Sequence, residues 1–576
     1  MKIKINNTFV AFSTPKYYNA YMDNIILTPN QLWADYNPDS TTLQISFQEY
    51  KDLGEFYSIK GYFNGDTFAD GTIRIFFHGF LPKINGFLPK IKCKKMVIIA
   101  DGHAGKLLEA DLSSIVKHEF GVLYFDYRGD MQNDLPHTVY PPSVDYANLL
   151  HAGKHLDCAI PTAKDTCVFV WTKVCRRVIS LAKQLIGKDS LIYILGLRRG
   201  ADIAWQTAAT DSRVNGLVAI FNAGWKEYAN IHKFSEKDIE LTDERERWLT
   251  GCASQTYAKL VKCPTLFVGT TNCDLTPVDR LENTLNIVAE KASVTKCICA
   301  GLTTNVYQSA VMLVPEWLER TSFKSPMPKT PLLDIGVVDK KFVVKVESDK
   351  DEPIEENCAY YCYDELNPRL RNWRKLTLDE KGKGEIPVYE HTKYIFVYAN
   401  TLFQNGFCMS SLPQCFEIED EEIDLAPYKK SQIIYERKNG TKAWLEESKE
   451  NEIAEYPSLQ AGAFDILGVT ASKGNLVTYS IGDNKYPADE NNLFQFDCYC
   501  QDERELEVEL TVQEDDKTII YSTIVQLNGS DQWQKHPIEL QSFKTADMMA
   551  MKSWKGIKKL TFKDIKGVLV NNILWV

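Results

Sequence analysis

Apolar stretches of strand length alternate with helix-like stretches over residues 94–320, and this alternation constrains the fold more than any other feature of the chain. The strand candidates are KKMVIIADG, GVLYFDYRG, SLIYILG, GLVAIFNAG, PTLFVGTT and TKCICAG. One helix candidate has apolar residues at a spacing of roughly 3.6: Val168, Trp171, Val174, Cys175, Val178, Ile179, Ala182 and Ile186. Strands that alternate with helices form a parallel sheet covered by helices. We therefore predict an α/β fold for this part of the chain.

The regions on either side have a different character. Residues 20–90 contain short β-like runs separated by turn residues, and the strand-rich remainder of the chain begins after Pro326-Met327-Pro328. We predict an α/β domain over residues 1–328, whose residues 1–93 form an N-terminal β extension. An immunoglobulin-like β-sandwich over 329–425 and a jelly roll over 426–576 follow it.

A sharp turn connects one of the strands to the next helix. The strand LIYILG leads through LRRG into the helical stretch ADIAWQTAAT, so Gly196 and Gly200 bracket Arg198. Glycines two residues before and after the central residue relieve crowding in such a turn, which presents the central side chain above the sheet. An arginine has five donors, no acceptor and a permanent positive charge, so it cannot attack a carbonyl. The turn thus has the frame of a catalytic site without a nucleophile.

The α/β part resembles the α/β-hydrolases, in particular the branch of acetyl xylan esterases and dienelactone hydrolases. Besides the turn, the resemblance rests on these stretches, which stand in the order of the family: LWADYNPDSTTLQISFQEY with DGTIRIFFHGFLPK, VIIADGHAG, FDYRGD and CPTLFVGTTNCDLTPVDR. It implies an α/β-hydrolase fold, a mostly parallel sheet flanked by helices, followed by all-β sandwich domains. It also implies a nucleophile, a carboxylate and a histidine, in that order along the chain.

Only the carboxylate of this implied triad is present. Arg198 stands at the nucleophile position, and Thr304 and Asn305 stand where the family has its histidine. Asp274 occupies the acid position, with Asp279 as a second candidate in the same loop. Without a base, even a serine would be a poor nucleophile, because its hydroxyl must lose a proton during attack.

A census of histidines supports this absence. The chain has nine histidines, and none lies between His232 and His391. A small shift of the alignment therefore cannot supply the missing base. His391 and His536 belong to the β-rich tail, which would have to reach over the edge of the sheet to contribute one of them.

Two interpretations of Arg198 remain open. A residue at this turn lies at the N-terminus of the following helix, where free N–H groups and the helix dipole favour anions, so Arg198 and Arg199 could bind a carboxylate or a phosphate. Alternatively, Arg198 fills a disused pocket and pairs with Asp274. His103 lies on the loop that would shape the oxyanion site and is a further candidate ligand-binding residue. It lacks the spacing of a metal motif, and we predict neither a metal nor a cofactor.

The last part of the chain resembles galactose-binding-like jelly rolls and carbohydrate-binding modules through GNLVTYSIGDNKY, NNLFQFDCYCQDERELEVELTV and VNNILWV. An exposed Trp533 or Tyr479 could stack on the flat apolar face of a sugar ring. Trp554 and Trp575 fall in apolar strands, and we predict that they belong to the core.

Composition narrows the classes of partner and compartment. A formal net charge of −11 argues against a general nucleic-acid binder, and no apolar run approaches the length of a membrane span. The first residues carry polar side chains where a signal peptide would be apolar. Fifteen cysteines, an odd number scattered through a long chain, fit reduced thiols. We expect a cytoplasmic protein without nucleic-acid or membrane partners.

Three functions are compatible with these features. The leading hypothesis is a catalytically degenerate α/β-hydrolase, a pseudo-enzyme retained for binding a carbohydrate or an anionic small ligand, or for protein assembly. The second is an active carbohydrate or small-ester hydrolase, similar to an acetyl esterase, that uses unconventional residues. The third is a structural protein whose β-domains bind a protein partner or another copy of the chain.

Overall fold

A computed structural model of the chain describes residues 26–83, 93–101, 115–116, 118–130, 135–233, 239–302, 307–418, 422–448, 456–514 and 517–576. Nine of the described strands form one sheet in the order β1-β2-β3-β5-β4-β6-β7-β8-β9. Their bounds are β1 Ser46–Asp52, β2 Phe56–Phe68, β3 Gly71–Pro82, β4 Lys95–Asp101, β5 Gly121–Phe125, β6 Leu191–Leu197, β7 Val214–Ile220, β8 Thr265–Thr270 and β9 Val294–Cys299.

The sheet combines a parallel and an antiparallel part. Strands β4 to β9 are mutually parallel, whereas β1, β2 and β3 pair antiparallel, and β3 also pairs antiparallel with β5. The residues expected to form an N-terminal β extension thus continue the main sheet beyond β5. The strands predicted from the apolar stretches of residues 94–320 occur where the alternation places them, and the predicted α/β class is confirmed.

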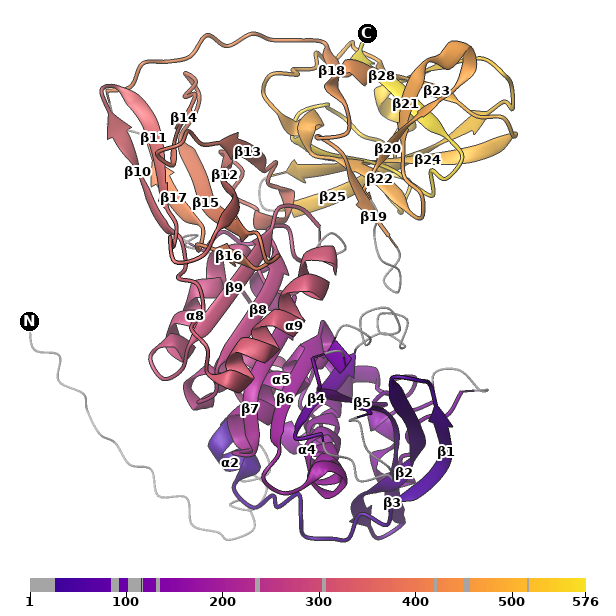
Figure 1. Cartoon of the computed structure of the whole chain (residues 1–576). Coiled ribbons are helices and arrows are strands. Elements are labelled where there is room, and N and C mark those ends of the chain that lie inside the picture. The colour runs from indigo at the N-terminus through magenta and orange to yellow at the C-terminus, as the bar shows by residue number, and fades with distance from the viewer. Residues whose placement is uncertain are drawn as a thin grey trace, which may run out of the picture.

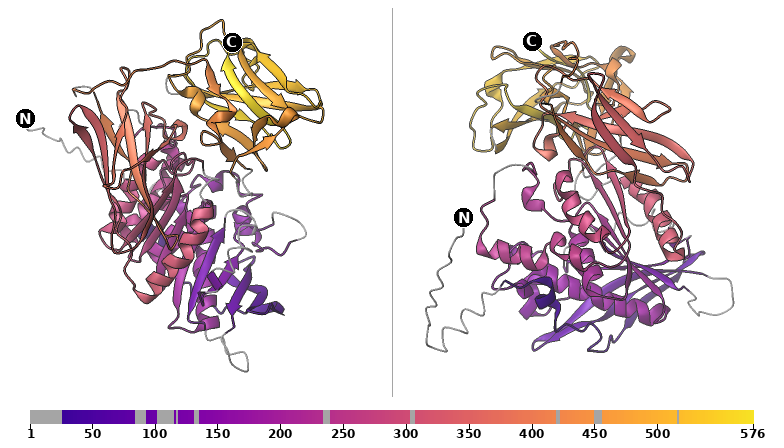
Figure 2. Two further views of the ribbon diagram at one scale, coloured as in Figure 1. Left: turned by 45° about the horizontal axis from the view of Figure 1, so that its top comes forward. Right: turned by 90° about the vertical axis from the view of Figure 1, so that its left-hand side faces the viewer.

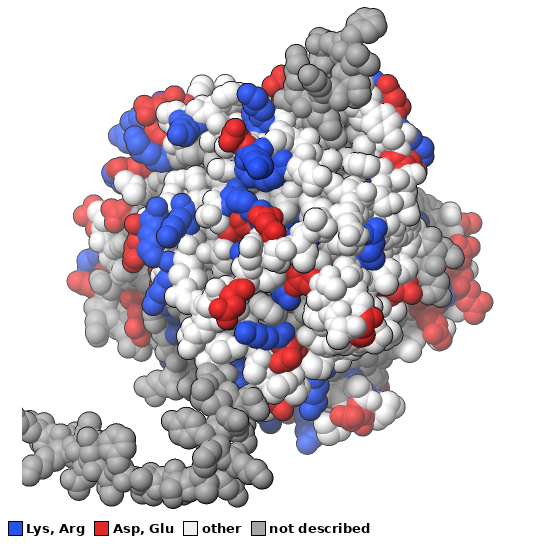
Figure 3. Space-filling model, turned by 90° about the horizontal axis from the view of Figure 1, so that it is seen from below, with Lys and Arg blue, Asp and Glu red and all other residues white. Residues whose placement is uncertain are grey.

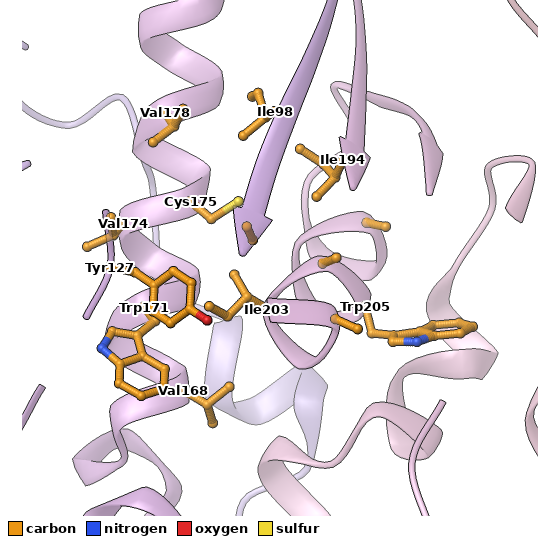
Figure 4. Close-up of a cluster of buried hydrophobic side chains, with 14 of the residues drawn as sticks. Ile98, Tyr127, Val168, Trp171, Val174, Cys175, Val178, Ile194, Ile203 and Trp205 are labelled. Carbon is orange, nitrogen blue, oxygen red and sulfur yellow. The ribbon is translucent and has the colours of Figure 1, made fainter. Parts of the chain in front are cut away.

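Helices cover both faces of this sheet (Figure 1). Their bounds are α2 Pro29–Trp33, α4 Cys167–Ile186, α5 Arg199–Thr210, α6 Asp243–Cys252, α7 Ser254–Tyr257, α8 Leu281–Ala289 and α9 Tyr307–Phe323. On one face, α4 and α5 pack against side chains such as Ile98 and Ile194, and Figure 4 shows this cluster. On the other face, Trp317 and Leu318 of α9 pack with Val97 and its neighbours. Alternating strand residues therefore serve two separate cores.

The predicted helix with the 3.6-residue spacing is α4. Its N-cap residue Thr166 accepts a hydrogen bond from the backbone N–H of Phe169 at 3.3 Å, and Gly187 ends the helix with a φ of 104°. The left-handed conformation at Gly187 is one that glycine adopts without steric cost. All eight apolar residues that define the pattern are buried. The spacing identified the correct helix and its buried face.

Two sheets follow in the middle β-unit, the name used here for residues 329–425. The first has the order β10-β11-β14, and the second β13-β12-β15-β16 with β17 paired to β15. Their bounds are β10 Leu332–Val338, β11 Lys341–Glu347, β12 Ile354–Tyr363, β13 Arg374–Thr377, β14 Lys383–Ile386, β15 Tyr394–Phe403, β16 Cys408–Ser410 and β17 Gln414–Glu417. Phe342, Val344, Ile395 and Val397 form part of a core that both sheets share.

Two larger sheets form the C-terminal β-unit, residues 426–576. Their orders are β20-β21-β28-β23-β26, with β18 paired to β28, and β19-β22-β27-β24-β25. The bounds are β18 Ile433–Tyr435, β19 Leu445–Glu447, β20 Ser458–Ala461, β21 Leu467–Thr470, β22 Asn475–Thr478, β23 Phe494–Tyr499, β24 Arg504–Glu514, β25 Lys517–Leu527, β26 Gln534–Ile538, β27 Ile557–Phe562 and β28 Leu569–Trp575. The chain therefore has an α/β part, a mostly parallel sheet flanked by helices, followed by all-β sandwiches. The immunoglobulin-like and jelly-roll types, and the boundaries at 328 and 425, stay predictions.

The two β-units lie together beyond one end of the large sheet (Figures 1 and 2). The middle β-unit covers the edge strand β9, because the hydroxyl of Ser410 accepts from the N–H of Ile298 at 2.7 Å and the amide of Asn400 donates to the carbonyl of Ile298 at 3.0 Å. A small apolar cluster joins all three parts through Leu302, Leu370 and Tyr479. The units are therefore packed against one another and share buried contacts.

Acidic and basic side chains are interspersed on the face that Figure 3 shows. In the portion of the chain that the structure describes, none of the helices combines the length and the apolarity that a membrane crossing requires. All fifteen cysteines lie among the described residues, and no disulfide joins any two of them.

Candidate functional site

The turn between β6 and α5 has the strained backbone of a nucleophile position. Arg198 has φ 53° and ψ −116°, a conformation that costs a non-glycine residue about 1 to 3 kcal/mol. Its N–H donates to the carbonyl of Ile220 at 3.0 Å. A Cβ atom on Gly196 would collide with the carbonyl of Gly200, and one on Gly200 would collide with the carbonyl of Ala100. Both glycines are therefore required by close backbone approach, as the sequence predicted.

A pocket of about 710 Å³ opens beside this turn. Arg198, Arg199 and Asp274 line it together, although Asp274 lies more than seventy residues later in the chain. The other charged residues of the lining are Lys60, Asp126, Arg128, Asp157, Asp202, Lys226, Glu227 and Arg245. The turn and the acid loop thus meet at the C-terminal edge of the parallel strands, where open α/β sheets bind ligands.

The guanidinium of Arg198 stands 5.4 Å from the ring centroid of Phe221, at cation–π distance. Among the described residues no carboxylate forms an ion pair with it, so the pairing with Asp274 that one interpretation required is not observed there. Arg199 differs, because its Nη1 lies 3.4 Å from Oδ1 of Asp157. Arg198 is half-buried and contributes its side chain to the pocket wall.

The two candidate acids have different surroundings. Asp274 is exposed and lines the pocket. Asp279 instead forms a bidentate ion pair with Arg371 of the middle β-unit, whose side chain is 0% exposed. A carboxylate committed to a buried partner in this way is unsuited to orient a catalytic histidine. The second candidate acid is thus a structural residue.

Two further histidines line the pocket, and the sequence analysis assigned neither of them to it. His78 on β3 lies 2.8 Å from the hydroxyl of Ser58 through its Nε2, and Nδ1 of His137 lies 2.9 Å from the carbonyl of Leu135. Burial, assisted by the charge of Lys60, lowers the pKa of His78 to about 4. The signal available in the sequence was the alternation of TIRIFFHGF, which places His78 on the strand face opposite the α4 core.

The remaining histidine candidates are elsewhere. His391 of the middle β-unit packs 4.6 Å from the ring of Tyr428, and His536 stacks on Phe496 in the C-terminal β-unit at 5.3 Å. Neither lines the pocket at the turn. His103, Thr304 and Asn305 lie outside the described residues.

Buried carboxylates brace the wall of the pocket. Asp126 accepts hydrogen bonds from the backbone N–H groups of Gly129 at 3.1 Å and Thr138 at 2.8 Å. Asp202 accepts from the hydroxyl of Ser254 at 2.6 Å and the amide of Asn222 at 3.0 Å. Burial raises the pKa of both carboxyls. Ser254 is the one serine among the described residues of the lining, and its buried hydroxyl is engaged with Asp202 instead of being presented for attack.

Two arginines of the lining, Arg245 and Arg128, have local partners. Arg245 forms an ion pair with Glu227 and stacks at 4.3 Å on Trp248, and Nε of Arg128 lies 3.5 Å from Asp126. Across the described ranges, no three histidine, cysteine, aspartate or glutamate side chains are arranged so that they could hold a metal ion.

The predicted aromatic site of the C-terminal β-unit is changed by the structure. Tyr479 is 5% exposed and packs in the three-way cluster with Leu302 and Leu370, so the prediction that it stacks on a sugar is wrong. Trp533 is half-buried beside Tyr499, at 5.9 Å between ring centroids. Trp554 and Trp575 are buried and 5.0 Å apart, which confirms their place in the core.

Comparison with known proteins gives similarity of structure only. No family model matches the chain, and no curated protein matches it in sequence. Among solved structures, acetyl xylan esterase 1 from Thermoanaerobacterium sp. JW/SL YS485 has 14% identity and a TM-score of 0.32, covering 50% of this chain and 85% of its own. The acetyl xylan esterase from Paenibacillus sp. R4 has 15% identity and a TM-score of 0.35, covering 54% and 96%. The glucuronoyl esterase from Solibacter usitatus has 12% identity and a TM-score of 0.36, covering 51% and 91%.

Proposed function

We propose that this chain is a catalytically inactive α/β-hydrolase that retains the pocket at its strand-to-helix turn for binding a small polar ligand. The observation that carries the proposal is Arg198, a side chain without nucleophilic character held in the strained position from which a nucleophile would act. The persistence of that strain beside an open pocket supports continued use of the site, because strained backbone is typical of functional positions.

The chemistry of the lining argues against acyl transfer. A guanidinium stays protonated and has no lone pair available for attack. Ser254, the serine among the described lining residues, is buried and hydrogen-bonded to Asp202. His78 has its Nε2 on the hydroxyl of Ser58, which is 3% exposed and absent from the pocket lining. Binding requires none of these groups to react.

Turnover of p-nitrophenyl acetate and of acetylated xylan by the purified full-length chain tests this proposal. The variants Asp274→Ala, His78→Ala and His103→Ala are compared with Arg437→Gln, which changes an exposed residue of the C-terminal β-unit. We expect the same rate for all five proteins, equal to that of buffer. A wild-type rate above buffer that disappears in Asp274→Ala, His78→Ala or His103→Ala, but not in Arg437→Gln, would establish an active hydrolase instead.

A second candidate function, binding of glycans by the C-terminal β-unit, is favoured by the tip of the β20–β21 hairpin. Phe464 at this tip is 84% exposed and has a left-handed φ of 59°, and Nε1 of Trp533 donates to the carbonyl of Ala463 at 3.3 Å. A glycan array with wild type and Trp533→Ala, together with light scattering for the oligomeric state, tests it. A glycan signal that Trp533→Ala removes supports sugar binding, whereas a defined oligomer with no glycan signal favours assembly.

A further inference from the structure

Four cysteines gather where the middle β-unit packs against the edge strand β9, and Figure 1 shows β16 lying beside that strand. Cys297 and Cys299 belong to β9, Cys408 to β16 and Cys358 to β12. Cys297 and Cys358 are buried, whereas Cys299 and Cys408 are half-buried. Thiols from two parts of the chain thus share one junction.

Hydrogen bonds to Ile298 fix how β16 lies on β9. The N–H of Ile298 donates to the hydroxyl of Ser410, and its carbonyl accepts from the amide of Asn400. Ser410 and Cys408 stand two residues apart on β16, so their side chains project from the same face of that strand, the face toward β9. Cys408 is therefore held against β9 beside Ile298, the residue that follows Cys297.

The thiol of Cys297 is in hydrogen-bonding contact with two other thiols, those of Cys299 and Cys408. These contacts, ahead of burial, raise the pKa of Cys297 well above its ordinary value. The three side chains pack in one apolar core with Phe403 and Phe407. Because the thiolate is the reactive form of cysteine, the buried and protonated Cys297 is unsuited to start a reaction with an oxidant. The half-buried Cys408 is the thiol of this contact that a small oxidant can reach from the middle β-unit.

Strand geometry selects the pair that can form a disulfide. Cys297 and Cys299 project from the same face of one extended strand, which keeps their Cβ atoms about 6.5 Å apart. A disulfide requires a Cβ separation of about 3.5 to 4.5 Å. Cys408 approaches Cys297 from a different strand, so this restriction does not apply to it. The pair that can bridge the junction is therefore Cys297 with Cys408.

We infer that Cys297 and Cys408 are a redox modification site, which a peroxide converts into a disulfide that links the middle β-unit to the edge of the large sheet. None of the four cysteines at the junction lines the pocket at the turn. The site therefore lies outside the machinery of the proposed function and does not depend on it.

The reaction proceeds in two balanced steps. The sulfur of Cys408 attacks one oxygen of hydrogen peroxide, the O–O bond breaks, and a sulfenic acid and one water are formed. The sulfur of Cys297 then attacks the sulfenic sulfur, and the S–S bond forms as the S–O bond breaks. The proton of the Cys297 thiol passes to the departing hydroxide, which leaves as a second water. The two thiols are oxidised by two electrons, and the peroxide is reduced by the same number.

The bond would close a loop of roughly 110 residues that contains most of the middle β-unit. A disulfide across a long loop stabilises a protein mainly because it restricts the unfolded chain. We therefore expect the oxidised protein to melt about 2 to 5 °C higher than the reduced protein.

Peptide mapping of the full-length chain tests the inference. The protein is treated with hydrogen peroxide, unfolded without reductant in the presence of an alkylating agent, digested and analysed by mass spectrometry. We expect the peptides of Cys297 and Cys408 to be joined, and a reductant to separate them. If Cys297 is recovered alkylated after peroxide treatment, or if Cys408 is joined to Cys299 or Cys358, the inference is wrong.

Variants separate the two roles. Cys408→Ser should abolish the link and the rise in melting temperature, while Cys415→Ser, which changes an exposed cysteine of β17, should leave both unchanged. Cys297→Ala removes the second thiol, so the sulfenic acid on Cys408 should accumulate and react with dimedone severalfold more than in the wild type. Equal dimedone labelling in Cys297→Ala and wild type would contradict the order of the two steps. A link that forms without raising the melting temperature would contradict its role in holding the middle β-unit.

Discussion

Arg198 and Arg371 are two arginines near the C-terminal edge of the same sheet, and the structure uses them in opposite ways. Arg371 is fully buried, forms a bidentate ion pair with Asp279 and stacks 3.7 Å from the ring centroid of Phe396. Arg198 is half-buried in an open pocket and has no ion pair with any carboxylate that the structure describes. The first charge is paired within the fold, whereas the second lines the pocket at cation–π distance from Phe221.

The loop after β8 explains how both arrangements coexist. Its start supplies Asp274 to the pocket, whereas its neighbour Asn272 donates to the carbonyls of Arg369 at 2.9 Å and Arg371 at 3.0 Å. The middle β-unit therefore holds the loop that would carry the acid of an esterase. The difference between the two arginines indicates that this loop now fixes the β-units in place while it still borders the pocket.

The largest effect is expected from breaking the buried pair. Arg371→Met leaves the carboxylate of Asp279 without its partner in a desolvated place, and removal of one member of a buried ion pair costs about 3 to 5 kcal/mol. Urea unfolding measured by circular dichroism gives the free energy of unfolding. Lys341→Met is the control, because Lys341 pairs with Glu385 at an exposed position and should cost less than about 0.5 kcal/mol. Equal losses in both variants would contradict the structural role of Arg371.

Gly196 and Gly200 should determine the conformation of the turn that carries Arg198, and the charge of Arg198 should not contribute to it. Gly200→Ala brings a methyl group against the carbonyl of Ala100 and should lower the free energy of unfolding by about 1 to 3 kcal/mol. Gly336→Ala is the matched control, because open space surrounds that position. If the two variants unfold at the same urea concentration, the close approach at the turn is not a constraint.

Local patterns made much of the fold predictable from the sequence. The spacing of Val168, Trp171 and Val174 identified α4 because an amphipathic helix exposes its period directly, and Gly196 and Gly200 identified the turn because a Cβ atom fits at neither. Such features depend on residues close together in the chain. The same reasoning correctly placed Trp554 and Trp575 in the core.

Features formed between distant segments could not be predicted in this way. The pair of Arg371 and Asp279 joins residues 92 positions apart, and nothing near either residue indicates the other. His78 enters the pocket because β3 continues the sheet next to β5, a pairing that is long-range. Tyr479 was expected to be exposed, but it packs against Leu302 and Leu370 from the other two parts of the chain.

His78, a residue of the pocket lining, should make the stability of the protein depend on pH. Its folded-state pKa of about 4 lies below its ordinary value of 6.5, so the unfolded chain binds the extra proton first as the pH falls. Stability from this residue is therefore complete above pH 6.5 and is lost as the pH falls toward 4. Because the ring is partly hydrated, we expect this loss in the free energy of unfolding to be about 1 kcal/mol. The measurement is the drop in free energy of unfolding between pH 7.5 and pH 5, which should be smaller in His78→Gln. Equal drops would contradict the assignment.

The smallest effect separates the strain at Arg198 from its charge. Arg198→Gly relieves a left-handed conformation but adds backbone entropy to the unfolded chain, so we expect a net gain of about 0.5 kcal/mol in the free energy of unfolding. Arg199→Gly is the matched control one residue later, in helical conformation, where glycine should cost about 1 kcal/mol. Opposite signs in urea unfolding would show that the fold tolerates the strain at Arg198 without needing its side chain. A loss at Arg198 as large as the loss at Arg199 would mean that the guanidinium stabilises the fold, as that of Arg371 does, and the contrast between the two arginines would disappear.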